Sequence, residues 1–401
     1  MNPHVGIAWQ IGSTFGWGVY GTQLALGLSR RNRLPTLLES PGPLTLDALE
    51  SNALKPALDF RPRLVELIKR QGDGPIVCQF PVIHARGNDA ELQFGRLSPR
   101  TRGTANHACI FFDRTTFSAG AIEQLNRFDS VIAGSAWNGA HLRALGVENV
   151  FDNIQGIDAS RFHPAPRRGL LAGRFAIFSG GKIEHRKGQD IVAAAFRAFR
   201  QRHDDAVLVT SWHNAWPKAE GVREIMRSRV FDGESLLDDE GRIDVRRWLT
   251  TNGVPGESVI VLPEIPNALL PPVIRECDVA VFPNRCEGGT NLVAMEALAL
   301  GVPSLLSANT GHMDLLDRQI GFALSEQSPV PEAQSGPDYD VWGESSVDEI
   351  VERLEAVYQN RQAFREVALA HARLMEDLSW TRQIDRLMDH LGIPDPLTPA
   401  R

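Results

Sequence analysis

The sequence has few cysteines, no excess of positive charge and no long apolar run, and each of these features narrows the class of protein. Four of its 401 residues are cysteine, and none forms a Cys-x-x-Cys pair. We therefore expect reduced, mostly buried thiols and a cytoplasmic protein. The formal net charge is −7, which argues against a broad nucleic-acid-binding surface. No run of about 18 apolar residues occurs, so we predict no membrane span, while peripheral membrane contact stays open.

Several familiar catalytic motifs are also missing. The sequence has no His-Glu-x-x-His, no serine nucleophile elbow, no Walker A loop and no cluster of ligands with metal-binding spacing. The first residues lack the basic segment and apolar run of a signal peptide, so we expect none. We predict no bound metal ion and no cofactor.

Apolar runs alternate with helical patterns along most of the chain, which predicts an α/β fold with parallel sheets. The expected strands are 5–11, 35–39, 76–79, 108–112 and 131–134, then 175–179, 206–211, 259–262, 279–283 and 304–307. Turn formers and prolines at 151–170 mark a domain boundary. We predict two Rossmann-like, doubly wound domains, 1–160 and 161–375, followed by a C-terminal helical segment, 376–401. If the two sheets face each other, the central cleft is the default active site.

Residues 281–303 hold the most informative pattern in the chain. A buried strand ends at Pro283, a turn with Glu287 and two glycines follows, and a helix is predicted over 291–300. Backbone N–H groups at such a helix start attract anions. Glu296 stands among apolar neighbours, so a buried carboxylate there needs hydroxyl or cationic partners, such as a ribose diol. A phosphate-sized anion beside two carboxylates suits a sugar nucleotide.

A basic turn follows the predicted strand 175–179. Lys182, Arg186 and Lys187 precede a helix that starts at Gln189. Cations at the carboxyl end of a strand can hold a diphosphate and neutralise the charge that develops when it leaves. The alternative is an ordinary solvated turn.

Three of the four glycines in segment 12–21, Gly16, Gly18 and Gly21, form a Gly-x-Gly-x-x-Gly arrangement, and Glu39 follows at a distance typical of dinucleotide binding. The first of these glycines lies well beyond the end of the strand, which disfavours NAD. With a helix expected near 21–30, we interpret the glycines as a flexible loop that approaches a phosphate or an acceptor. Tight packing of helix on strand is the simpler alternative.

Asp113 follows the expected strand 108–112, at the edge where an acceptor would bind, so it is a candidate for positioning or deprotonating an acceptor hydroxyl. A helix cap or a pair with Arg114 is an equally good interpretation. His84 is a weaker catalytic candidate. We interpret His312 and Asp314 as structural loop residues.

Taken together, these segments resemble a retaining glycosyltransferase of family 4, which has the GT-B fold. The segments are SGGKIEHRKGQDIVAAAF, FDNIQGIDASRFHP, DSVIAGSAWNGAHLRALGV, CEGGTNLVAMEALALGVP and LSWTRQIDRLM. The resemblance implies that Lys182 and Lys187 clamp the diphosphate, with Arg186 beside them. It implies that Glu296 binds the ribose and that Glu287 contacts the donor sugar. Backbone amides of the turn that holds Gly289, Thr290, Asn291 and Leu292 would contact phosphate. One residue more than is usual in the family separates the two glutamates, and an aspartate, Asp113, stands where members often carry a histidine.

The predicted function is therefore that of a hexosyltransferase that uses a nucleoside-diphosphate sugar without a metal ion. Asp113, Lys187 and Glu287 are the catalytic candidates. The acceptor class stays open among glycan, lipid, protein and small molecule. Alternatives are a nucleotide-sugar epimerase or phosphorylase of the same fold, an NAD-dependent oxidoreductase, and a nucleotide-sugar sensor without activity.

Overall fold

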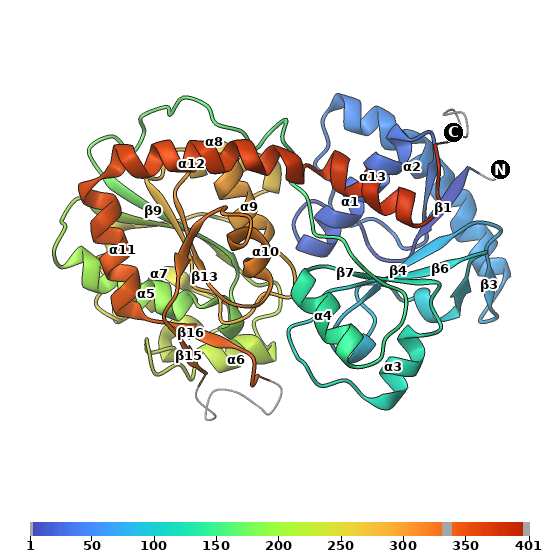
Figure 1. The fold of residues 1–401 in the computed structure, drawn as a ribbon, viewed down its shortest axis with the longest axis horizontal. Coiled ribbons are helices and arrows are strands. Elements are labelled where there is room, and N and C mark those ends of the chain that lie inside the picture. Colours follow the sequence, from blue (N-terminus) through green and yellow to red (C-terminus); the bar gives the residue numbers. More distant parts are fainter. Residues whose placement is uncertain (1–2, 331–338, 396–401) are drawn as a thin grey trace. The chain divides into compact units, whose positions relative to one another are not determined.

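The computed structural model describes residues 3–330 and 339–395. The chain divides into two compact units (Figure 1). The first unit contains the residues up to Gly156 together with those from Leu378 onwards, and the second contains Ile157–Asp377. Each unit is built on a six-stranded sheet, and all the neighbouring strands in both sheets are parallel. The predicted α/β class with two parallel sheets is confirmed.

The first sheet has the strand order β2-β1-β4-β6-β7-β8. Its strands are β1 His4–Ile7, β2 Leu34–Leu37, β4 Val82–Arg86, β6 Asn106–Ile110, β7 Ser130–Ala133 and β8 Val150–Asp152. A short separate pair joins β3 Ile76–Val77 to β5 Thr101–Arg102. The helices of this unit are α1 Gly16–Arg30, α2 Ala48–Arg70, α3 Ala119–Leu125, α4 Ala136–Ala144 and α13 Trp380–His390, with 3₁₀ turns η1 Asn88–Ala90 and η2 Ser98–Arg100.

The second sheet has the order β11-β10-β9-β12-β13-β14. Its strands are β9 Phe175–Lys182, β10 Ala206–His213, β11 Val259–Val261, β12 Val279–Phe282, β13 Ser304–Ser307 and β14 Phe322–Leu324. An antiparallel pair joins β15 Gln327–Pro329 to β16 Gly343–Ser345. The strands β12 and β13 are buried along their length because helices cover both faces, which explains the apolar residues of β12 and of the middle of β13.

The helices of the second unit connect these strands. They are α5 Gln189–Arg200, α6 Glu220–Ile225, α7 Val245–Thr251, α8 Pro271–Ile274, α9 Leu292–Ala299, α10 Met313–Leu316, α11 Val347–Gln359 and α12 Arg361–Met375. Short 3₁₀ turns are η3 His185–Lys187, η4 Glu234–Leu236, η5 Gly256–Ser258, η6 Asn267–Leu269 and η7 Thr310–His312, and η8 Glu376–Leu378 follows α12. The core of this unit lies between its sheet and helices such as α5 and α11.

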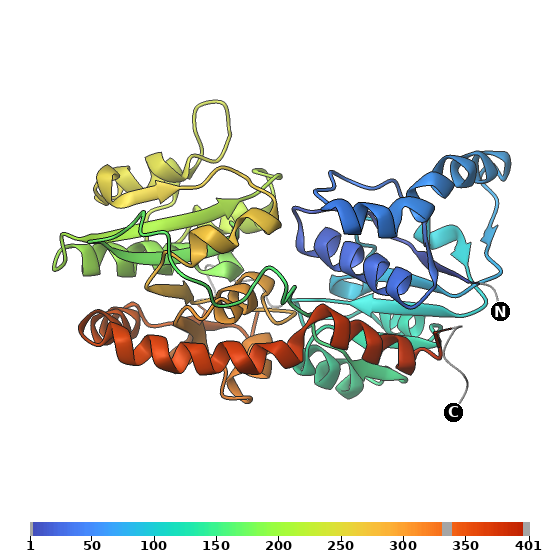
Figure 2. The ribbon, with the colours of Figure 1, turned by 90° about the horizontal axis from the view of Figure 1, so that it is seen from above.

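The C-terminal helices pack against different units of the chain. Within the second unit α12 contacts α9, and within the first unit α13 contacts α1 (Figure 2). At the second of these contacts, Gly27 lets α1 approach closely, since a Cβ atom there would lie 2.6 Å from Cγ2 of Ile384. Arg30 and Arg31 both pair with Asp385 at the edge of the same contact.

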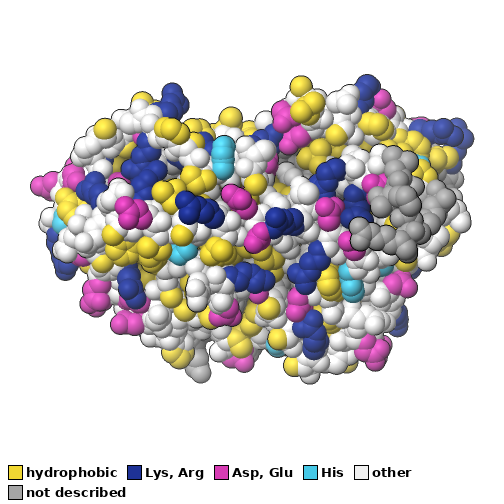
Figure 3. Space-filling view, turned by 45° about the horizontal axis from the view of Figure 1, so that its top comes forward, with side chains coloured by type: hydrophobic (Ala, Val, Ile, Leu, Met, Phe, Trp, Pro, Cys, Tyr) yellow, Lys and Arg dark blue, Asp and Glu magenta, His cyan; other side chains and the backbone are white. Residues whose placement is uncertain are grey.

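Two properties of the molecule bear on the predictions about nucleic acid and membranes. On the face shown in Figure 3, Lys and Arg side chains are interspersed with Asp and Glu side chains rather than gathered into one basic patch. Across residues 3–330 and 339–395, no helix combines the length and apolarity that crossing a membrane requires. All four cysteines are buried, whereas the sequence predicted that most of them would be.

Candidate active site

Two loops meet at the carboxyl edge of the second sheet, one after β9 and one after β12, because these strands are neighbours. Backbone N–H groups of Arg285 and Cys286 both donate to the carbonyl oxygen of Arg186, at 2.7 and 3.2 Å. Gly188 has a φ of 68°, and a Cβ atom there would lie 2.3 Å from the carbonyl oxygen of Pro283. Only glycine fits this turn and this approach. The structure thus brings together the basic turn and the glutamate turn that the sequence singled out.

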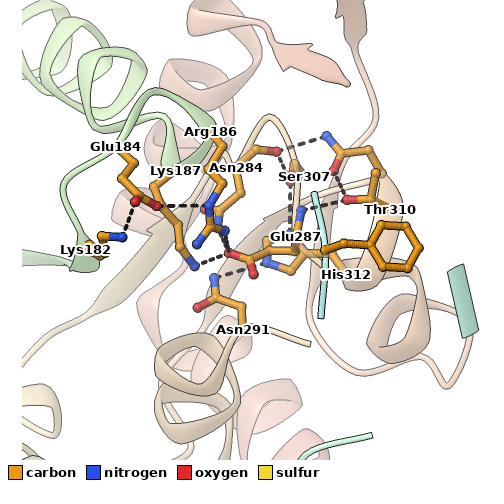
Figure 4. A network of polar contacts seen from close by, with 12 residues as sticks. Lys182, Glu184, Arg186, Lys187, Asn284, Glu287, Asn291, Ser307, Thr310 and His312 are labelled. Atoms are coloured by element: carbon orange, nitrogen blue, oxygen red, sulfur yellow. Dashed lines mark hydrogen bonds and ion pairs between the residues drawn. The ribbon is translucent and has the colours of Figure 1, made fainter. Parts of the chain in front are cut away.

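Glu287 is the centre of the polar network formed by these loops (Figure 4). Its carboxylate forms an ion pair with Lys187, accepts from Nδ2 of Asn284 at 2.6 Å, and lies 3.4 Å from a guanidinium nitrogen of Arg186. Burial alone would raise the pKa of Glu287, but the charges of Lys187 and Arg186 outweigh it and lower the pKa. Glu287 is therefore ionised at neutral pH and holds both cations in place.

Lys182 occupies the outer end of the same network. Its ammonium forms an ion pair with Glu184 and lies 5.3 Å from the centre of the Trp216 ring. The Lys182 side chain is 39% exposed, against 11% for Lys187. The two lysines proposed as a diphosphate clamp therefore each contact a carboxylate, and Lys182 is the one open to solvent.

The turn before α9 is fixed by a second polar network (Figure 4). The Asn291 side chain contacts Nε2 of His312 at 3.1 Å, and Nδ1 of the same ring lies 2.9 Å from the Ser307 hydroxyl. Burial lowers the pKa of His312 to about 4, so the ring is neutral. This geometry agrees with the structural role expected for His312.

The start of α9 presents backbone N–H groups that suit an anion. Asn291, the residue before the helix, has a φ of 58°, and its side chain forms no capping hydrogen bond with the first turn. Gly311 in η7 packs tightly under the turn, because a Cβ atom there would lie 1.8 Å from the carbonyl oxygen of Gly289. Uncapped N–H groups at a helix start are ready donors for a phosphate. The structure thus places Gly289, Thr290, Asn291 and Leu292 on this turn, where the sequence expected them; their contact with phosphate stays a prediction.

Glu296 lies on α9 and is 3% exposed. Its Oε1 atom accepts from Nδ2 of Asn267 at 2.6 Å, whereas its Oε2 atom is buried without a hydrogen-bond partner among the described residues. Burial, together with the charge of Asp158, raises the pKa of Glu296 to about 8, although the hydrogen bond from Asn267 opposes this. A buried oxygen with no partner costs free energy unless a ligand donates to it.

The candidate residues for activating the acceptor, Asp113 and His84, lie in the first unit. Asp113 follows β6, and Asn88 holds it twice: the Asn88 side-chain N–H₂ donates to the carboxylate at 2.9 Å, and its oxygen accepts from the Asp113 backbone N–H at 3.0 Å. The carboxylate is thus fixed at the carboxyl edge of the first sheet. His84 is 1% exposed and its ring contacts Ser98 at 2.7 Å, which gives it a structural position in the sheet.

The prediction of a flexible glycine loop over residues 12–21 was wrong in part, because α1 begins at Gly16 rather than near Gly21. Gly18 and Gly21 lie inside the helix, and a Cβ atom at Gly21 would lie 2.7 Å from Nε1 of Trp9. Packing of α1 against residues 9–12, which follow β1, thus explains these two glycines. Glu39 accepts from the backbone N–H of Leu97 at 2.6 Å, so it has a structural partner. Contact of Gly16 or Gly18 with a phosphate stays a prediction.

Sequence reasoning missed a buried ion pair that fixes the basic turn. The Arg285 guanidinium donates to both carboxylate oxygens of Asp190, at 2.8 and 2.7 Å, and to the carbonyl oxygen of His185 at 2.8 Å. It also contacts Glu344 on β16 at 2.8 Å. Asn267, Asn284 and Glu184 were missed as well. Their residue types are common in surface loops, so the sequence carried no signal for them.

The comparisons with known proteins agree with this architecture. Residues 269–387 match the model of a family described as "Family 4 Glycosyltransferase in conflict systems". The chain is 30% identical over 163 residues to a D-inositol 3-phosphate glycosyltransferase of Arthrobacter sp. (strain FB24), a match that covers 38% of this chain and 33% of that protein. The matched part thus spans about a third of that relative.

Among solved structures, Thermosynechococcus elongatus sucrose-phosphate synthase has a TM-score of 0.67 at 15% identity, covering 98% of each chain. Anabaena HepE in complex with UDP has a TM-score of 0.61 at 14% identity, covering 97% of this chain and 99% of that one. The two parallel-sheet units are therefore those of the GT-B fold. The family match over 269–387 agrees with the resemblance seen in the sequence.

Proposed function

We propose that the protein is a retaining glycosyltransferase that moves a sugar from a nucleoside-diphosphate sugar to an acceptor hydroxyl. The observation that carries the proposal is the pair of glutamates on either side of the α9 turn. Glu287 anchors the cations Lys187 and Arg186, and Glu296 offers a buried oxygen that has no partner among the described residues. A nucleoside diphosphate fits both, because its phosphates suit the cations and the helix start while its ribose hydroxyls suit the open oxygen.

In this proposal the donor breaks at the bond between the anomeric carbon and the diphosphate oxygen. Lys187, Arg186 and the N–H groups at the start of α9 stabilise the negative charge that develops on the departing diphosphate. These groups supply the stabilisation without a metal ion. Glu287 keeps both cations oriented and contacts the donor sugar. Glu296 binds the ribose.

The first unit supplies the acceptor side of the reaction. Asp113, held by Asn88 at the carboxyl edge of the first sheet, positions the acceptor hydroxyl or accepts its proton. The hydroxyl attacks from the face that the diphosphate leaves, so the anomeric configuration is kept. Glycans, lipids, proteins and small molecules are all acceptor classes for this arrangement.

Support for the donor class comes from the fold relatives. Structures of Anabaena HepE hold UDP or UDP-glucose. Nucleotides with other bases are equally good candidates for this chain, so the donor should be sought among UDP, GDP, ADP and dTDP sugars. We infer a hexose as the transferred sugar.

A thermal-shift screen of those diphosphates and their sugars tests the donor proposal. We expect one nucleoside diphosphate to raise the melting temperature, since a ligand that binds only the folded state stabilises it by mass action. Lys187→Ala and Glu296→Ala should each remove most of that rise. Glu276→Gln is the matched control, because Glu276 is buried in the same unit, just before β12, and its carboxylate accepts from the backbone N–H groups of Arg168 and Gly169.

Three outcomes would count against the proposal. If both site variants respond like the parent protein, the site assignment is wrong. Stabilisation by NADH with no response to any nucleoside diphosphate would select an oxidoreductase. Turnover of a nucleotide sugar without any acceptor would select an epimerase.

The retaining mechanism is tested by proton NMR of the transferred sugar, which should show the same anomeric configuration as the sugar in the donor.

A further inference from the structure

The basic turn carries a carboxylate that the proposed reaction does not use. Glu184 lies between two of the site's cations: it forms an ion pair with Lys182, and its Oε2 atom accepts from Nε of Arg186 at 3.0 Å (Figure 4). Its side chain is 12% exposed. Together with Glu287 it makes an alternating chain of charges, Lys182–Glu184–Arg186–Glu287–Lys187.

Glu184 is ionised in this setting. Burial by itself would raise the pKa of its carboxyl, but the charges of Arg186 and Lys182 outweigh it and lower the pKa. The cluster of three cations and two carboxylates therefore has a net charge of +1, counted as three minus two. Without the Glu184 charge it would be +2, so Glu184 halves the positive charge that a diphosphate meets.

The backbone of the turn does not depend on this side chain. The Gln189 side chain donates to the carbonyl oxygen of Lys182 at 2.9 Å, and Asn214 donates to that of Ile183 at 3.0 Å. The Glu184 side chain packs beside Gly221, where a Cβ atom would lie 3.2 Å from its Cγ. A neutral side chain of the same length therefore fits the same position, and the role of Glu184 is electrostatic.

We propose that Glu184 limits how tightly the site holds a diphosphate. This inference rests on the proposed function. A glycosyltransferase must release its nucleoside diphosphate after each transfer, and a carboxylate held beside the clamp repels that product. Glu184 forms ion pairs with Lys182 and Arg186, whereas Lys187 forms its ion pair with Glu287, so Glu184 acts mainly on the outer part of the clamp.

Isothermal titration calorimetry of the full chain with UDP, GDP, ADP and dTDP tests this inference. Glu184→Gln should bind the preferred diphosphate about three- to tenfold more tightly than the parent at low salt, and the difference should shrink in high salt. Inorganic pyrophosphate should show the same change. Glu355→Gln is the matched control: Glu355 also pairs with two basic side chains, Arg202 and His203, but on α11. The Glu355→Gln protein should bind the diphosphate as tightly as the parent protein does.

The result that would overturn the inference is a Glu184→Gln protein that binds the diphosphate equally or less tightly. Glu184→Met, which removes the charge and keeps the length, gives the same test if the first variant does not fold. The two proposals fail differently. If the parent protein binds no nucleoside diphosphate, the proposed function is wrong. If the parent binds one and neither variant binds it more tightly, only the role of Glu184 is wrong.

Discussion

Glu296 has two carboxylate oxygens in different environments, and this difference is the strongest sign of a ligand at the scale of single residues. One oxygen accepts from Asn267, and the other is buried without a partner among the described residues. A side chain kept only for stability would satisfy both oxygens or be apolar. The carboxyl is thus prepared for a donor that arrives from outside, such as a hydroxyl group.

The raised pKa of Glu296, about 8, predicts a pH dependence of stability. Between its unfolded value near 4.5 and about 8, the folded state keeps a proton on this carboxyl that the unfolded state has lost. Its contribution is therefore present at low pH and lost as pH rises through the folded pKa, by up to about 4 kcal/mol between pH 5 and pH 8. Glu296→Gln should show a smaller fall in unfolding free energy over this range.

Urea unfolding of both proteins at several pH values measures this difference directly. Comparing the two proteins cancels the other titrating groups, such as His312, whose lowered pKa gives a dependence of the opposite sign. Equal slopes for the parent and Glu296→Gln would contradict the account of this carboxyl.

At the scale of elements, the glycines of α1 differ in their packing: Gly21 packs closely against neighbouring side chains, and Gly16 does not. A Cβ atom at Gly21 would lie 2.7 Å from Trp9 and 2.8 Å from Ile11, whereas a Cβ atom at Gly16 would have no neighbour within 4 Å. Gly21→Ala should therefore cost about 1–3 kcal/mol of stability. Gly16→Ala should be neutral or gain up to about 1 kcal/mol, because alanine favours the helix. Chemical denaturation of the two variants measures both values.

The same pair of variants tests the two interpretations of the glycines. If no ligand approaches the start of α1, Gly16→Ala should bind the preferred nucleoside diphosphate like the parent. Loss of binding without loss of stability would instead show that the start of α1 approaches a phosphate.

Elements with long apolar runs could be predicted from the sequence, and elements with interrupted patterns could not. The buried strands β9 and β12 and the helix α9 were found because most of their residues are apolar. The helix α2 was missed, because Pro56 and Pro62 lie inside it and its pattern is mostly polar. Its capping box, formed by Asp47 and Glu50, was the signal that could have located its start.

At the scale of the whole molecule, the two-sheet plan followed from alternating elements, but the strand order did not. The pairing of Arg285 with Asp190 and of Lys187 with Glu287 depends on β9 and β12 being neighbours, which no local pattern encodes. The sequence could therefore name the basic turn and the glutamate turn as candidates. Only the fold shows that Glu287 binds the cations directly.

A crystal structure of the protein with its preferred nucleoside diphosphate tests the central claim most directly. We expect the diphosphate against Lys187 and the N–H groups at the start of α9, and a ribose hydroxyl donating to the Oε2 atom of Glu296. A nucleotide bound instead at the carboxyl edge of the first sheet, near Gly16 and Glu39, with the second unit unoccupied, would contradict the account.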